Sequence, residues 1–146
     1  MMNDKFALVT GASQGLGRAF ATELAARGIH VLMTALPGEN LDSFSASLSA
    51  RYGVFTDYLE CDLTDITEIT RLTDWAKTYP LYLLINNAGL GGTAAFESVG
   101  SALINNIILV NVRATAMITH QLLTTLRAQG SAWILNVSSM ASFSPI

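Results

Sequence analysis

Short apolar runs alternate with longer segments of mixed polarity along this chain of 146 residues. A continuous apolar run bounded by turn residues is typical of a strand that is covered on both faces. Ile29–Ala35 is such a run, and strands are predicted there and at Lys5–Val9, Val54–Cys61, Leu81–Ile85 and Trp133–Val137.

The segments between the predicted strands predict helices at about Gln14–Arg27 and Asn40–Tyr52, and a third helix that Thr64 or Asp65 can cap, in a segment that Pro80 closes. The apolar face of that third helix is predicted from Ile66, Ile69, Leu72, Trp75 and Ala76. A fourth, long helical region is predicted from Phe96 to Ala128. It is apolar on several faces, so we expect one face to pack on the sheet and another to meet a second subunit in a homodimer or homotetramer.

Repeated strand–helix alternation predicts an α/β fold, a Rossmann-type doubly wound parallel sheet with strand order 3-2-1-4-5. Residues 1–146 are expected to form a single domain. In such a sheet, ligands bind at the carboxyl ends of the strands beside the switch in strand order. Distinctive polar groups follow several of these strands: Ser13, Asp62, Asn87 and Ser139. We expect them to meet on one rim.

The first strand runs into a glycine-spaced turn from Thr10 to Gly17, and a helix follows. In that context Gly11 allows a tight turn, Gly15 lets a pyrophosphate approach the backbone, and Gly17 permits close packing of helix on sheet. The helix N-terminus offers free N–H groups to phosphates. The alternative is a purely structural turn.

Composition narrows the classes of partner. Apolar residues make up 51% of the chain and charged residues 13%, the net charge is −3, and no basic cluster occurs, which argues against nucleic acid. No uninterrupted apolar run approaches the roughly 18 residues of a membrane span, and the start lacks a signal pattern, so a cytoplasmic protein without a membrane segment is expected.

The single cysteine, Cys61, is interpreted as a buried thiol without a chemical role. His30 and His120 are isolated, so no metal site is predicted.

The motifs together resemble the short-chain dehydrogenase/reductase family. They are Thr-Gly-x-x-x-Gly-x-Gly at Thr10–Gly17, Asn86-Asn87-Ala88-Gly89, Asn111 within the long helix, and Asn136-Val137-Ser138-Ser139. The resemblance implies an oxidoreductase that moves a hydride between NAD or NADP and a small-molecule carbonyl or alcohol.

The resemblance also assigns the cofactor-binding residues. The phosphates and adenosine ribose would be held by Gly11, Ser13, Gln14, Gly15 and Leu16. Asp62 and Leu63 would contact the adenine, although Asp62 could instead be a helix cap. Asn87, Ala88 and Gly89 would line the cofactor, and Asn86 would brace the sheet.

The catalytic residues implied by the resemblance are Asn111 and Ser139. Asn111 would kink the helix and hold a water molecule of a proton relay. Ser139 would donate a hydrogen bond to the substrate oxygen, with Ser138 as the alternative.

Two departures from the family pattern matter. The first concerns the cofactor. Ala35 and Leu36 stand where a carboxylate would bind the 2′-hydroxyl of NAD, and neither residue is charged, which favours NADP slightly over NAD.

The second departure concerns the acid/base pair of the family, a tyrosine followed four residues later by a lysine. No tyrosine in this sequence has a lysine four residues on. We therefore expect the N-terminal portion of a longer enzyme, truncated after the fifth strand and inactive alone. The alternative is a non-catalytic dinucleotide-binding or scaffold protein.

Overall fold

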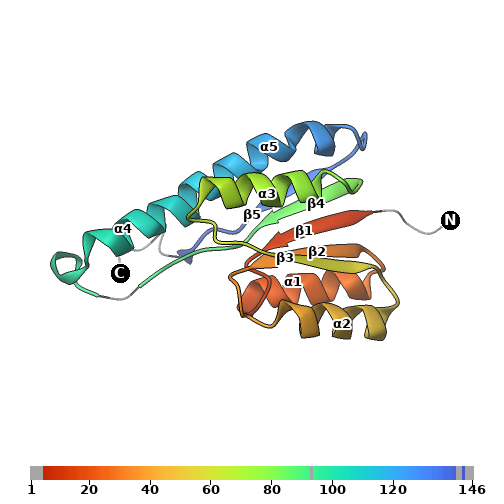
Figure 1. Cartoon of the computed structure of the whole chain (residues 1–146), viewed down its shortest axis with the longest axis horizontal. Helices are drawn as coiled ribbons and strands as arrows, with labels where there is room; N and C mark the ends of the chain where they lie inside the picture. The colour runs from red at the N-terminus through yellow and green to blue at the C-terminus, as the bar shows by residue number, and fades with distance from the viewer. Residues whose placement is uncertain (1–4, 93, 141–142, 144–146) are drawn as a thin grey trace.

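The structure is a computed structural model, and it describes residues 5–92, 94–140 and 143. These residues form a parallel sheet with helices on both faces (Figure 1). The strands are β1 (Phe6–Thr10), β2 (His30–Ala35), β3 (Thr56–Glu60), β4 (Leu81–Asn86) and β5 (Trp133–Asn136). Every neighbouring pair is parallel and the order is β3-β2-β1-β4-β5, which confirms the predicted topology.

Two apolar layers sandwich the sheet because successive strand residues point to opposite faces. Ala7 and Val9 of β1 face one layer, which holds the helices α1 (Gly15–Ala26) and α2 (Leu41–Tyr52). Leu8 faces the other layer, which holds α3 (Ile66–Ala76) and α5 (Thr115–Arg127). Figure 1 shows α1 and α2 on one side of the strands, and α3 and α5 on the other.

The helix α3 begins where the sequence indicates, since the Asp65 side chain accepts a hydrogen bond from the backbone N–H of Thr67. Its apolar face is narrower than predicted. Ile69, Leu72 and Ala76 are buried, but Ile66 lies in the first turn and is 42% exposed. The prediction for Ile66 was therefore wrong, because the first turn lies beyond the edge of the core.

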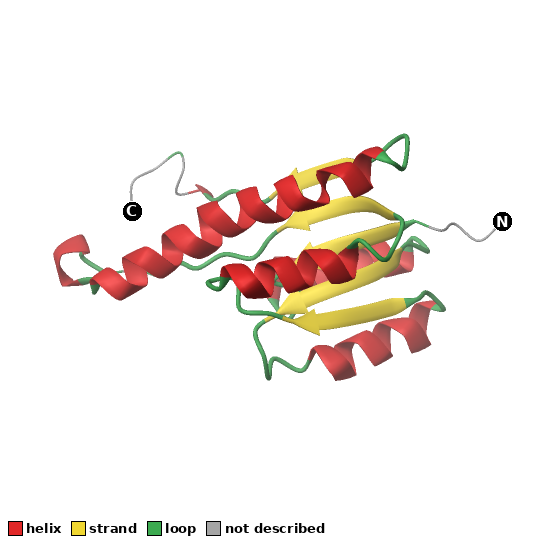
Figure 2. Ribbon diagram, turned by 45° about the horizontal axis from the view of Figure 1, so that its top comes forward, coloured by secondary structure: helices red, strands yellow, loops and turns green. Residues whose placement is uncertain are grey.

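The long helical region is not one helix from Phe96. A 3₁₀ turn covers Phe96–Ser98, Val99 and Gly100 are extended, and α4 (Ser101–Ile108) then begins. A π-helical segment, Leu109–Ala114, joins α4 to α5. Together they form a rod of 27 residues that extends past the carboxyl ends of the strands (Figure 2).

Only one stripe of this rod packs on the sheet, through Ala114, Ile118, Leu122 and Leu126. Other apolar side chains stay exposed, among them Ile108 at 53% and Val112 at 63%. One face thus packs on the sheet as expected, and the contact of another face with a second subunit stays a prediction. The rod is long and apolar enough, with a mean hydropathy of 1.4, to cross a bilayer by length and composition, a test that core helices also pass.

Candidate functional site

A pocket of about 430 Å³ opens at the carboxyl ends of the strands. Four loops far apart in the sequence line it, namely those after β1, β2, β3 and β4. The predicted cofactor-binding residues that lie on its wall are Gly11, Ser13, Gln14, Asp62, Leu63, Asn87, Ala88 and Gly89. The expected meeting of these loops on one rim is thus present in the structure for Ser13, Asp62 and Asn87.

The loops after β1 and β4 are joined by hydrogen bonds. The Thr10 hydroxyl accepts from the backbone N–H groups of Asn87 and Ala88, each at 3.0 Å. The Asn87 side chain donates to the carbonyls of Thr10 at 3.0 Å and Gly11 at 3.1 Å. These bonds hold the glycine turn against the end of β4.

Two glycines are required by this close approach. A Cβ atom at Gly11, where φ is +65°, would lie 2.8 Å from Cα of Ala88. A Cβ atom at Gly17 would lie 2.0 Å from the carbonyl oxygen of Gly11. The third glycine of the turn therefore brings α1 against the loop, as the spacing predicted.

The N-terminus of α1 is left open. Its N-cap, Gln14, makes no side-chain cap hydrogen bond, and the first turn contains no acidic residue. Gly15, with φ at +54°, has open space where its side chain would be, and Leu16 is 63% exposed. The N-terminus of α3 is capped internally by Asp65 and the first turn of α2 contains Asp42, whereas the N-terminus of α1 has neither feature and can bind an anion.

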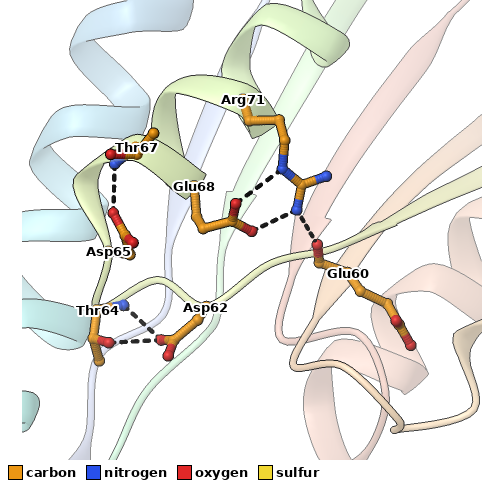
Figure 3. Close-up of polar contacts among 7 residues, drawn as sticks. All are labelled: Glu60, Asp62, Thr64, Asp65, Thr67, Glu68 and Arg71. Carbon is orange, nitrogen blue, oxygen red and sulfur yellow. Dashed lines mark hydrogen bonds and ion pairs between the residues drawn. The ribbon is translucent and has the colours of Figure 1, made fainter.

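The loop after β3 forms the far wall of the pocket. Asp62 Oδ1 accepts hydrogen bonds from the backbone N–H and the hydroxyl of Thr64, both at 2.8 Å, as Figure 3 shows. Asp65 rather than Asp62 caps α3, so the helix-cap alternative for Asp62 does not hold. The Arg113 guanidinium, from the π-helical segment, donates to the Thr64 carbonyl at 2.6 Å.

The end of β3 is fixed to α3 by a hydrogen bond from the Arg71 side chain. Arg71 contacts the Glu68 carboxylate at 2.5 Å and donates to the Glu60 carbonyl at 2.6 Å (Figure 3). The hydrogen bond from Arg71 to Glu60 therefore fixes the start of the loop that carries Asp62.

Cys61 also lines the pocket, but it is only 1% exposed. Burial raises its pKa to about 12, with the charge of Glu68 acting in the same direction. The thiol is therefore neutral at physiological pH and is a structural residue rather than a nucleophile, in agreement with the sequence interpretation.

Asn111 lies in the π-helical segment, and both of its side-chain polar atoms contact one backbone residue. Oδ1 accepts from the Leu90 N–H and Nδ2 donates to the Leu90 carbonyl, each at 2.8 Å. The side chain thus fixes the loop that continues from Asn87, Ala88 and Gly89. A π-helical turn is frequent at functional sites.

Ser138 and Ser139 follow β5 at the same end of the sheet but do not line the pocket. Asn86 braces this region as predicted, because its side chain donates to Asn136 at 2.8 Å and to Thr119 at 3.0 Å.

Sequence reasoning missed one carboxylate of the pocket, Glu39. It lies in the loop after β2, lines the pocket, and accepts a hydrogen bond from the Ser13 hydroxyl. The expectation that no charge stands near this edge is therefore corrected. Glu39 stands in the loop beyond the end of β2, so the residues at the strand end, Ala35 and Leu36, do not reveal it.

Within the part of the chain that the structure describes, no group of three or more histidine, cysteine, aspartate or glutamate side chains could hold a metal ion. The polar atoms on the pocket wall are backbone amides, hydroxyls, side-chain amides and carboxylates. Such groups suit a ligand with phosphates and hydroxyls.

The chain matches the family model described as short chain dehydrogenase over residues 5–146. It is 31% identical over 144 residues to hydroxysteroid dehydrogenase-like protein 1 from Gallus gallus, covering 97% of this chain and 44% of that protein. The chain thus spans about half the length of the curated relatives that it matches.

Two solved structures have the same fold. A short-chain dehydrogenase from Sphingobium yanoikuyae, in complex with NADPH, is 27% identical with a TM-score of 0.90 over 97% of this chain and 56% of that one. A metagenomic short-chain oxidoreductase in complex with NADP is 28% identical with a TM-score of 0.90 over 99% of this chain and 66% of that one.

Proposed function

Because the chain belongs to the short-chain dehydrogenase family, we propose that it supplies the dinucleotide-binding part of an NAD(P)-dependent oxidoreductase. The observation that carries this proposal is the pocket at the carboxyl ends of the strands, where four separate loops meet beside the uncapped N-terminus of α1. A doubly wound sheet binds dinucleotides at this position.

The pyrophosphate is expected at the glycine turn, where Gly11, Ser13, Gln14, Gly15 and Leu16 would surround it. The free N–H groups of the first turn of α1 and its partial positive charge suit an anion. The open space beside Gly15 is consistent with this assignment, because a phosphate oxygen can approach the backbone there.

The adenine would lie against Asp62 and Leu63, and the nicotinamide half would lie toward Asn87, Ala88 and Gly89. Asp62 Oδ1 is engaged by Thr64, which leaves Oδ2 to accept a hydrogen bond from the exocyclic amine of the adenine. Both halves of the pocket are anchored to the π-helical segment, one through Arg113 and the other through Asn111.

A bound nicotinamide would accept or donate the hydride at its C4 atom. The substrate would be a small molecule with a carbonyl or secondary alcohol group. Ser139, or Ser138 in its place, would donate a hydrogen bond to the substrate oxygen as charge develops. Asn111 would hold the loop at Leu90 and take part in proton transfer through a water molecule.

A general acid is also required, and none of the four tyrosines in this sequence has a lysine four residues on. Without such a donor, turnover would fall by about 10² to 10⁴-fold. We therefore propose that the 146-residue chain is inactive alone and that the acid/base pair belongs to a longer protein.

Both dinucleotide structures described above hold NADPH or NADP, which supports a lean toward NADP for this chain. A cytoplasmic location and a homodimer or homotetramer complete the proposal. The exposed apolar side chains of Ile108 and Val112 are consistent with a subunit contact.

The test is Gly15→Leu, with Gly53→Leu as the matched control. Both glycines have positive φ and open space around them, so both variants carry similar backbone strain, but Gly53 ends α2 at the opposite end of the sheet. Calorimetry should give a Kd for NADPH raised about 10-fold or more by Gly15→Leu alone, because its side chain blocks the phosphate position. Equal affinities in the two variants would remove the phosphate assignment.

A further inference from the structure

The loops after β3 and β4 line separate parts of the pocket, and the sheet does not place them side by side. Strands β2 and β1 lie between β3 and β4. Among the residues that the structure describes, no hydrogen bond runs directly from one of these loops to the other. Any direct link between them must therefore come from another element.

The π-helical segment provides this link. Asn111 forms its two hydrogen bonds with the backbone of Leu90, each at 2.8 Å, and Arg113 donates to the Thr64 carbonyl at 2.6 Å. Residues two apart on a helix do not face each other, so these two side chains can reach different loops. Val110, which directly precedes Asn111, is buried and lines the pocket. One short helical segment thus contacts both loops and the pocket itself.

The Arg113 contact is not explained by stability alone. Within the described part of the chain, Arg113 Nε is buried and has no hydrogen-bond partner. A buried donor without a partner destabilises the folded state, so an apolar side chain of similar length could occupy this position without a net loss. The arginine is better explained by the loop that it holds.

We propose that the π-helical segment couples the two halves of the nucleotide site, so that occupation of the adenine half strengthens binding in the nicotinamide half. This inference rests on the proposed function, which places the adenine against the loop after β3. A base bound there orders this loop and with it the Thr64 carbonyl. Arg113 then holds the π-helical segment and Asn111 holds Leu90, so the second ligand has less of the protein to order when it binds. Asn111 and Arg113 act in this coupling as positioning residues.

The experiment measures how one half of the cofactor changes the binding of the other. Calorimetry gives the Kd for reduced nicotinamide mononucleotide without adenosine and with adenosine at saturation, and the ratio of the two Kd values is the coupling factor. Adenosine has no phosphate, so it neither occupies the glycine turn nor repels the second ligand. We expect a coupling factor of about 5 or more in the wild-type protein and of less than about 2 in Arg113→Met.

Arg71→Met is the matched control. Arg71 fixes the same loop, but it does so from α3 through the Glu60 carbonyl rather than from the rod (Figure 3). This variant should raise the Kd for adenosine and leave the coupling factor within about 2-fold of wild type. If Arg113→Met does not fold, Arg113→Gln tests the same factor.

Amide hydrogen exchange gives a second readout, one that a merely structural role would not move. The Leu90 N–H donates to Asn111 Oδ1, so its exchange rate reports how firmly the loop after β4 is held. Adenosine should slow this exchange in the wild-type protein and in Arg71→Met, but not in Arg113→Met.

Two kinds of outcome contradict the proposal. A coupling factor near 1 in the wild-type protein while adenosine and the mononucleotide both bind, or a factor that Arg113→Met leaves unchanged, would overturn the coupling and leave the proposed function intact. Failure of the wild-type protein to bind NADPH, adenosine and the mononucleotide would overturn the proposed function, and this inference with it.

Discussion

At the amino ends of the strands aromatic rings fill the space between neighbouring segments, whereas at the carboxyl ends small residues and hydrogen bonds do so. Phe6 is in contact with His30 at a centroid distance of 4.7 Å, with Tyr79 at 5.1 Å and with Phe55 at 5.7 Å. Trp75 lies edge-on to Tyr79. These five residues come from the starts of β1 and β2, the segments before β3 and β4, and the end of α3.

The carboxyl ends contain no such cluster among the described residues that line the pocket. Thr10, Asn87 and Gly17 hold the loops there through directional hydrogen bonds and close backbone contact. Burial of aromatic surface tolerates small shifts because it is non-directional, but a hydrogen-bonded turn does not. The aromatic contacts at the amino ends of the strands therefore stabilise the sheet, and the loops at the carboxyl ends can leave a pocket for a ligand.

The strongest way to break this contrast is Gly17→Ala. The added Cβ would lie 2.0 Å from the Gly11 carbonyl oxygen and 2.5 Å from Nδ2 of Asn87, so α1 must move away from the turn. We expect the free energy of unfolding to fall by about 3 kcal/mol or more, as measured by urea denaturation. Gly91→Ala, at a loop position with open space, should change it by less than about 0.5 kcal/mol. Similar losses in both variants would contradict the close-packing argument.

A smaller effect is expected from the hydrogen bond that holds the loop after β3 at the carboxyl ends of the strands. Arg113→Met removes the hydrogen bond to the Thr64 carbonyl and so loosens the loop that carries Asp62. We expect the Kd for NADPH to rise about 10-fold, the equivalent of one charged hydrogen bond, while Tm changes little. Arg113→Lys should restore part of the affinity, and Arg127→Met, at the end of α5, should be neutral. An affinity loss that simply follows a drop in Tm would contradict a positioning role.

Much of the fold could be predicted from the sequence because its signals are local. Short strand-forming segments between turn residues indicate the strands, and their alternation with helices indicates the order of the sheet. The pocket residues Ser13, Asp62 and Asn87 were predictable because the ends of parallel strands meet at one edge. Such inferences need no knowledge of how a side chain is oriented.

The features that were missed depend on contacts between distant residues. The π-helical segment differs from an α-helix only in its hydrogen-bond spacing, and its contact from Arg113 to Thr64 crosses 49 residues. Glu39 reaches the pocket because of the positive φ of Gly38 and a bond to Glu60, neither of which a strand pattern reveals. Ile66 follows the helical period but lies past the edge of the core.

The smallest expected effect tests the aromatic end. The Tyr79 hydroxyl donates to Asp57 Oδ2 at 2.7 Å, and burial together with this bond raises the pKa of Tyr79 above its usual value near 10. Tyr79→Phe keeps the ring contacts and removes only the hydrogen bond. We therefore expect the free energy of unfolding, measured by urea denaturation near neutral pH, to fall by about 1 kcal/mol, with exposed Tyr58→Phe as the control.

The pH dependence of this loss follows from the raised pKa of Tyr79. Because the folded state holds the proton more tightly than the unfolded state, the stabilisation is complete below pH 10 and is lost as the pH rises above it. The difference between wild type and Tyr79→Phe should therefore shrink above pH 10, and a difference that stays constant with pH would show that the hydroxyl is not what stabilises this end of the sheet.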